Sequence, residues 1–174
     1  MVKSNKEISS NEEKIIDMMK GNARQTSIEL SKKVGMSRQT LQKTIRRLEE
    51  DHIIWGYVPV VNLHKIGKKL FITLIKTTPK IAKDKILEIL PIERNGMLKQ
   101  EGITLIYTGF THGYFDWVVI FAANDIVQAS KTMRDIEHKL SDFIEDLQIL
   151  EELMPIRFCG VLNPDYEKDL NYIL

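Results

Sequence analysis

The sequence predicts an α+β protein in which an N-terminal winged helix-turn-helix is followed by a ferredoxin-like β-α-β-β-α-β domain. Three observations support this prediction. Three short segments with helix-capping residues open the chain, and strand-length apolar runs alternate with helical segments after residue 70. The charge also changes sign, with 14 Lys and Arg against 8 Asp and Glu up to Lys69, and 11 against 16 beyond it. A basic first half indicates a polyanionic partner.

The first module, predicted to span residues 1–61, begins with two short helices. Each opens with a Ser or Thr and a Glu three residues later, which is the spacing of a capping box. These pairs are Ser10 with Glu13 and Thr26 with Glu29. The second helix is expected to end at Gly35, because glycine readily adopts the left-handed conformation of a C-terminal cap.

The third helix carries the prediction of function. Ser37 can cap it, and Leu41, Ile45 and Leu48 recur at the spacing of one buried face. No acidic residue lies between Met36 and Leu48, whereas an ordinary solvated face would usually mix both signs. The pattern favours a recognition helix, in which Arg reads guanine and Gln reads adenine in the major groove. The predicted DNA-binding residues are Ser37, Arg38, Gln39, Thr40, Gln42, Lys43, Arg46 and Arg47.

The stretch that follows the third helix is predicted to be extended. Residues Ile53 to Val61 are rich in β-forming types, but Gly56 and Pro59 disfavour a long central strand. We therefore expect a short wing and then an extended segment. Residues 62–69 are predicted to form a linker with one turn that ends at Gly67.

The second module, residues 70–162, is predicted to fold as β-α-β-β-α-β, with a tail over residues 163–174. The expected strands are Leu70 to Thr78, Ile103 to Thr111 and Phe115 to Ala123, with a last strand somewhere between Leu147 and Val161. The expected helices are Lys83 to Leu90 and a longer amphipathic helix from Ile126 to Phe143. The second and third strands are separated only by a connection of hairpin length.

Several short motifs in both modules are similar to those of one family. They are Asn22-Ala23-Arg24, Glu29-Leu30, Val34-Gly35-Met36-Ser37, Arg47-Leu48-Glu49, Ile54, Gly56-Tyr57, Ile66-Gly67 and Gly113-Tyr114-Phe115-Asp116. With these motifs the chain resembles the Lrp/AsnC (feast/famine) transcription regulators, from about Asn11 to Val161. The resemblance implies binding of double-stranded DNA as a homodimer or higher homo-oligomer. It also implies a C-terminal domain that binds an amino acid or another small effector.

Gly113, Tyr114 and Asp116 are the candidate effector-binding residues. The Asp116 carboxylate could accept the ammonium group of an amino acid, and backbone N–H groups near Gly113 could hold its carboxylate. The alternative is that Asp116 only stabilises the turn by bonding to its own backbone. Because Asp and Gly are ordinary turn residues, the sequence favours this alternative.

The remaining reactive residues do not suggest catalysis. The four histidines show no metal-ligand spacing with one another or with Cys159, so no catalytic site, metal site or cofactor is predicted. Cys159, the one cysteine, is expected to be a buried structural thiol. With one cysteine, a polar N-terminus and no apolar run near the roughly 20 residues that span a bilayer, the chain is expected to be cytoplasmic and not to bind a membrane.

Two alternative functions stay open at this point. One is an enzyme similar to siroheme decarboxylases, which resemble the same two-domain architecture, since a fold does not determine a function. The other is a non-sensing oligomerising adaptor. The basic third helix favours the regulator over the enzyme, because decarboxylation does not require a cationic helix face there.

Overall fold

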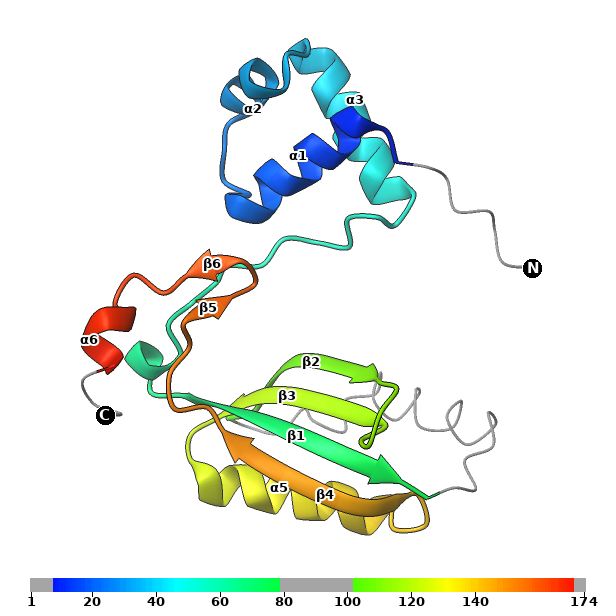
Figure 1. Cartoon of the computed structure of the whole chain (residues 1–174), viewed down its shortest axis with the longest axis vertical. Coiled ribbons are helices and arrows are strands. Elements are labelled where there is room, and N and C mark those ends of the chain that lie inside the picture. Colours follow the sequence, from blue (N-terminus) through cyan, green and yellow to red (C-terminus); the bar gives the residue numbers. More distant parts are fainter. Residues whose placement is uncertain (1–7, 79–101, 171–174) are drawn as a thin grey trace. The chain divides into compact units, whose positions relative to one another are not determined.

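The computed structural model describes residues 8–78 and 102–170, and these form two compact units (Figure 1). The first unit contains the described part of Met1–Val60 together with the described part of Pro155–Tyr172. The second contains the described part of Val61–Met154. The first is a helical unit with a small hairpin, and the second is built on a β-sheet, as the α+β prediction required.

Three helices make up the helix-turn-helix: α1 (Ser10–Gly21), α2 (Ser27–Val34) and α3 (Arg38–Glu50). Four apolar side chains, at most 3% exposed, form their shared core, with contributions from each helix. They are Ile15, Leu30, Leu41 and Leu48. The sequence placed both leucines of α3 on the buried face correctly, because apolar residues seven apart return to the same side of a helix.

The predicted caps of α2 and α3 are confirmed. The Thr26 hydroxyl accepts the Glu29 N–H while the Glu29 carboxylate accepts the Thr26 N–H, which is a complete capping box. Gly35 ends α2 with φ of 74°, in the left-handed region that favours glycine. Ser37 accepts the Thr40 N–H at 3.1 Å and so begins α3.

The predicted cap of α1 is wrong by one residue. The capping box is formed by Ser9 with Glu12, and not by Ser10 with Glu13. Both pairs have the same spacing, so local sequence cannot separate them. The Glu12 side chain is buried and forms an ion pair with Arg47 of α3, and this tertiary contact selects the register.

The stretch from Ile53 to Val61 has no strand in the structure, so the expected wing is not observed as a strand. The extended segment that was also expected is present. The start of the stretch folds back on α3. The Trp55 indole donates to the His52 carbonyl at 2.6 Å, and the Tyr57 hydroxyl donates to the Glu49 carboxylate at 2.8 Å. The predicted turn follows as a 3-10 helix, η1 (His64–Ile66), and ends at Gly67.

The second unit is an antiparallel sheet in the order β2-β3-β1-β4. Its strands are β1 (Lys69–Thr77), β2 (Thr104–Phe110), β3 (Trp117–Ala123) and β4 (Ile144–Glu151). One helix that packs on it is α5 (Ile126–Lys139), which supplies Ala129, Met133 and Ile136 to a core shared with Phe71 and Phe121. The strand order is that of a ferredoxin-like fold. The expected helix Lys83 to Leu90 lies outside the described residues.

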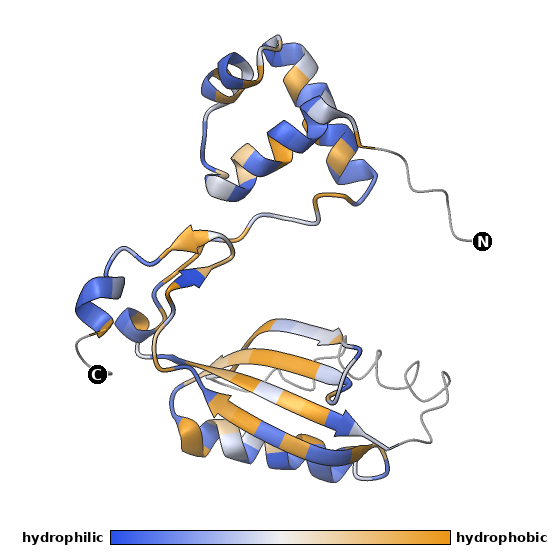
Figure 2. Cartoon of the chain, in the orientation of Figure 1, coloured by the Kyte–Doolittle hydropathy of each residue, from blue (hydrophilic) through white to orange (hydrophobic). Residues whose placement is uncertain are grey.

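Side chains of the sheet alternate between two faces. Phe71, Thr73 and Ile75 of β1 are buried, and Phe71 and Ile75 pack in the core with α5. The side chains between them point to the other face, which we call the open face. It is defined by Ile72 and Leu74 of β1 with Val118 and Ile120 of β3, all only partly buried. Figure 2 shows how strongly apolar these strands are.

The C-terminal end of the sequence prediction needs two corrections. The last sheet strand begins at Ile144, three residues before the predicted range, because Phe143 and Ile144 are buried where the chain leaves α5. Beyond it, β5 (Arg157–Phe158) and β6 (Val161–Leu162) form a separate hairpin, and α6 (Tyr166–Leu170) follows. Among the described residues, no helix is long and apolar enough to cross a membrane.

Candidate functional site

The exposed face of α3 gathers the predicted DNA-binding side chains. All eight predicted residues are exposed, whereas Leu41 and Leu48 are fully buried on the opposite side. Gln39, Lys43 and Arg46 follow the helical spacing i, i+4, i+7 and therefore form one outward stripe, which we call the cationic stripe. No acidic residue of α3 lies between Arg38 and Leu48, so this face is positive until Glu49 and Glu50 at the end of the helix.

Ser37 and Thr40 have a structural role at the start of this face. The Ser37 hydroxyl caps the helix and also lies 2.8 Å from the Thr40 hydroxyl. The two side chains therefore hold the first turn of α3 together. Because the first N–H groups of a helix point outward from such a cap, this turn can still receive a phosphate.

Arg47 differs from the other cations of α3. Its guanidinium donates to the Glu12 carboxylate on α1 while about half of its side chain stays exposed. The Ser9 hydroxyl and N–H also donate to Glu12. These hydrogen bonds from Ser9, together with Arg47, lower the pKa of Glu12 from 4.5 to about 2. Arg47 therefore fastens α3 to α1, a role that the sequence analysis missed because the partner is 35 residues away.

The hairpin between β2 and β3 brings Gly113, Tyr114 and Asp116 to one cavity of about 550 Å³. One Asp116 oxygen accepts both the N–H and the hydroxyl of Thr77, each at 2.9 Å. These hydrogen bonds lower the pKa of Asp116. The carboxylate thus bonds to a neighbouring strand rather than to its own turn, which is neither of the two roles considered from the sequence.

The other residues of this cavity were not predicted from the sequence. They are Lys76, Thr77, Thr78 and Glu145. The Lys76 ammonium lies 3.6 Å from the Glu145 carboxylate and 4.6 Å from the centre of the Tyr114 ring. A signal was present, since Lys76 is the one charge inside the apolar run that begins at Leu70.

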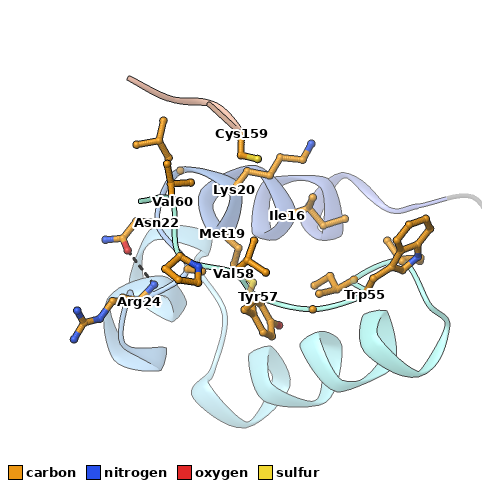
Figure 3. Close-up of a pocket in the computed structure, with 17 residues that line it drawn as sticks. Ile16, Met19, Lys20, Asn22, Arg24, Trp55, Tyr57, Val58, Val60 and Cys159 are labelled. Atoms are coloured by element: carbon orange, nitrogen blue, oxygen red, sulfur yellow. Dashed lines mark hydrogen bonds between the residues drawn. The ribbon is translucent and has the colours of Figure 1, made fainter. Parts of the chain in front are cut away.

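A second hollow lies in the helical unit, a groove of about 750 Å³ between α1, the stretch after α3 and the β5–β6 hairpin (Figure 3). Met19, Tyr57 and Val58 line its middle, and Cys159 lies at its edge. Cys159 is exposed at the tip of the hairpin, so its predicted burial is wrong. Among the described residues, no three His, Cys, Asp or Glu side chains are grouped as metal ligands.

Sequence comparison relates this helical unit to known DNA-binding domains. Residues 8–54 match the family described as winged helix-turn-helix DNA-binding. The leucine-responsive regulatory protein of Haemophilus influenzae is 30% identical over 86 residues, which are 47% of this chain and 52% of that protein. The HTH-type transcriptional regulator LrpA of Pyrococcus horikoshii is 36% identical over 67 residues, 38% of this chain and 48% of that protein. The chain thus spans about half the length of these curated relatives.

Structure comparison extends the likeness to both units. An AsnC family transcriptional regulator from Agrobacterium tumefaciens has a TM-score of 0.68 at 17% identity, with 95% of this chain and 99% of that chain covered. A transcriptional regulator from Neisseria meningitidis, solved as an L-Met complex, has a TM-score of 0.66 at 18% identity, with 97% and 100% covered. The fold of these regulators is therefore shared over nearly the whole chain.

This chain is similar to the Lrp/AsnC regulators. The winged helix-turn-helix match, the names of the curated relatives and the shared two-unit fold agree on this similarity. The Gly113 to Asp116 hairpin connects β2 to β3, and β2 is an edge strand of the sheet. The sequence resemblance to this family is confirmed.

The ion pair of Glu12 generates a prediction about pH. The pKa of Glu12 is lowered in the folded state, so its contribution to stability is present above about pH 4.5 and is lost as the pH falls toward 2. The Glu12→Gln variant should therefore be less stable than the parent near pH 6, and the difference should shrink below pH 4.5. Hydrogen exchange of the α1 and α3 amides measures it. Glu13→Gln, at the neighbouring exposed position, is the control, and an equal effect of both variants would contradict the account.

Proposed function

We propose that this protein is a transcriptional regulator of the Lrp/AsnC type that binds double-stranded DNA through α3. The single observation that carries the proposal is the exposed face of α3, which is cationic and free of acidic residues along nearly its whole length. Recognition helices present their N-terminal residues to base edges in the major groove. The names of the curated relatives support the same function.

The residues of α3 divide by expected role. Gln39 and Arg38 lie in the first turn, where side chains reach base edges, and amide and guanidinium groups bond bases in bidentate fashion. Lys43 and Arg46 lie further along the cationic stripe, and we expect them to contact phosphates. Such phosphate contacts supply affinity that depends on salt but not on sequence.

We also propose that the protein works as a homodimer or a higher homo-oligomer. The open face of the sheet leaves Ile72, Leu74, Val118 and Ile120 partly exposed, and Leu150 beside Ile72 is 48% exposed. A contiguous apolar surface of this kind marks an interaction site. Pairing two copies would cover it and present two recognition helices to half-sites about 34–36 Å apart or a multiple of that.

We place an effector site at the cavity formed by Gly113, Tyr114 and Asp116, and we infer that the effector is an amino acid. The cavity offers both signs of charge, as a zwitterion requires. The L-Met complex of the Neisseria meningitidis regulator supports this class of ligand.

We favour the regulator over a siroheme-decarboxylase-like enzyme or a passive adaptor. The cationic face of α3 is useful for DNA and superfluous for either alternative. A single exposed cysteine fits a reducing cytoplasm, which is where such a regulator would act.

The DNA-binding proposal predicts the behaviour of a triple variant. Arg38→Ala, Lys43→Ala and Arg46→Ala together should weaken binding to a duplex pool by roughly tenfold or more, because charge-assisted contacts to bases and phosphates are lost. The salt slope should fall by roughly 0.9 for each lost phosphate contact. Fluorescence anisotropy at several salt concentrations measures both. Arg47 is left intact because it holds α1.

The control removes the same charge elsewhere. The control is a triple variant with Lys131→Ala, Arg134→Ala and Lys139→Ala, all at exposed positions of α5. This variant should bind DNA as tightly as the parent does. If the α3 variant binds as tightly as the parent, or if both triple variants weaken binding equally, α3 is not the DNA-binding element.

The oligomer proposal predicts that charge on the open face dissociates the protein. Ile72→Lys with Leu150→Lys places two cations on neighbouring strands of this face and should convert a dimer into a monomer in light scattering at micromolar concentration. Val127→Lys, at a position that is 71% exposed on α5, is the control and should stay dimeric. A parent protein that is already monomeric would contradict the proposal.

A further inference from the structure

The cavity beside the β2–β3 hairpin contains two charged residues, Lys76 and Glu145, in addition to the Asp116 of the sequence motif. Of the three candidate residues there, Asp116 has one oxygen occupied by two hydrogen bonds from Thr77. A carboxylate that already holds a strand in place is poorly suited to be the main contact for a ligand that comes and goes. The charges that remain available in the cavity are Lys76 and Glu145.

Lys76 and Glu145 have the geometry of a loose ion pair. Their charged atoms are 3.6 Å apart, which is longer than the roughly 2.7–2.9 Å of a charge-assisted hydrogen bond. Their side chains are 30% and 46% exposed, so neither is sealed from a ligand. The Lys76 ammonium also lies over the face of the exposed Tyr114 ring, which limits where it can move.

We infer that Lys76 and Glu145 are the pair that reads the two charges of the effector, with Asp116 as a positioning residue. The ligand's carboxylate would take the Lys76 ammonium, and the ligand's ammonium would take the Glu145 carboxylate. Each charge keeps a partner of opposite sign during the exchange, so no uncompensated charge is created. This inference rests on the proposed effector site and names the ligand class that it selects.

The selected class is an α-amino acid without an acidic side chain. Lys76 carries one positive charge, while Glu145 and Asp116 carry two negative charges, so the cavity has a net charge of −1. A neutral zwitterion leaves that balance unchanged, whereas aspartate or glutamate would add a third carboxylate beside the other two. Carboxylates within one cavity repel one another, and this repulsion discriminates against acidic amino acids.

The position of Lys76 also connects the cavity to assembly. Lys76 continues the alternation of Ile72 and Leu74 along β1, so it projects from the same side of the sheet as the open face. A ligand that reorganises the Lys76–Glu145 pair therefore acts at one end of the surface that we propose for pairing. Thr77 faces the other side, where Asp116 fixes it.

The test uses the full chain and calorimetry against the twenty amino acids. The tightest neutral binder is then compared with its analogue that lacks the carboxylate and its analogue that lacks the ammonium; for L-methionine these are 3-(methylthio)propylamine and 4-(methylthio)butanoate. In the parent, each analogue should bind about 10- to 100-fold more weakly, which corresponds to one lost charge-assisted contact. Acidic amino acids should bind more weakly than neutral ones.

The variants show which residue reads which group. In Lys76→Met, the amino acid should bind no more tightly than its analogue without the carboxylate, because the ligand's carboxylate no longer has a partner. The same variant should still bind the amino acid more tightly than the analogue without the ammonium. Glu145→Gln should do the reverse. Lys131→Met and Glu137→Gln, at exposed positions of α5, should change neither ratio.

The possible failures are distinguishable. If the parent binds an amino acid and Asp116→Ala abolishes binding while both ratios survive in Lys76→Met and Glu145→Gln, this inference is wrong and the effector site stands. If acidic amino acids bind most tightly, the inference is also overturned. If no amino acid binds, the inference and the effector site both fall, while a DNA titration of the same sample tests the regulator proposal separately.

Discussion

The rotation of α3 about its own axis is the constraint on which the account of this protein depends. Leu41 and Leu48 are both fully buried, against the core that also holds Ile15 and Leu30. Because an α-helix has about 3.6 residues per turn, burial of these two leucines makes Gln39, Lys43 and Arg46 face outward. The Arg47–Glu12 ion pair acts in the same sense, because it ties one flank of α3 to α1. The outward direction of the face that we propose for DNA binding thus follows from side-chain packing in a small core.

The sheet obeys an analogous constraint with a period of two. Burial of Phe71, Thr73 and Ile75 sends Ile72, Leu74 and Lys76 to the other side of β1. One strand therefore contributes both to the surface proposed for assembly and to the cavity proposed for the effector. A ligand at that cavity has a direct physical means of biasing the contact between copies, because it touches the end of the same face.

The sequence predicted elements well where local chemistry decides them. The Thr26–Glu29 box, the Gly35 cap and the Ser37 cap depend on residues within a few positions of one another, and all three are confirmed. At the first helix, Ser9 and Ser10 precede Glu12 and Glu13 at equal spacing, and only a contact with Arg47 in another helix separates the two registers. Local sequence carries no information about that contact.

The candidate site shows the same division. The outward face of α3 could be predicted from helical periodicity, because the residues that do not belong to the buried apolar stripe must face outward. The partner of Asp116 could not, since Thr77 is 39 residues earlier and becomes a neighbour only when β1 pairs with β3. The last strand was placed too late because β4 mixes polar and apolar residues without a clean alternation. Burial of Cys159 was predicted because free cysteines are buried in most proteins, whereas here a tight hairpin exposes the side chain.

The central claim is that the outward face of α3 is the surface that meets DNA. Titration of the isotope-labelled protein with a duplex selected from a random pool tests it most directly, through the amide and side-chain NMR signals of each residue. The account predicts that the largest changes occur at residues 37–47, led by the Gln39 side-chain amide, while α5 is unaffected. Changes confined to the sheet unit, or none in α3 at a concentration that saturates binding, would contradict it.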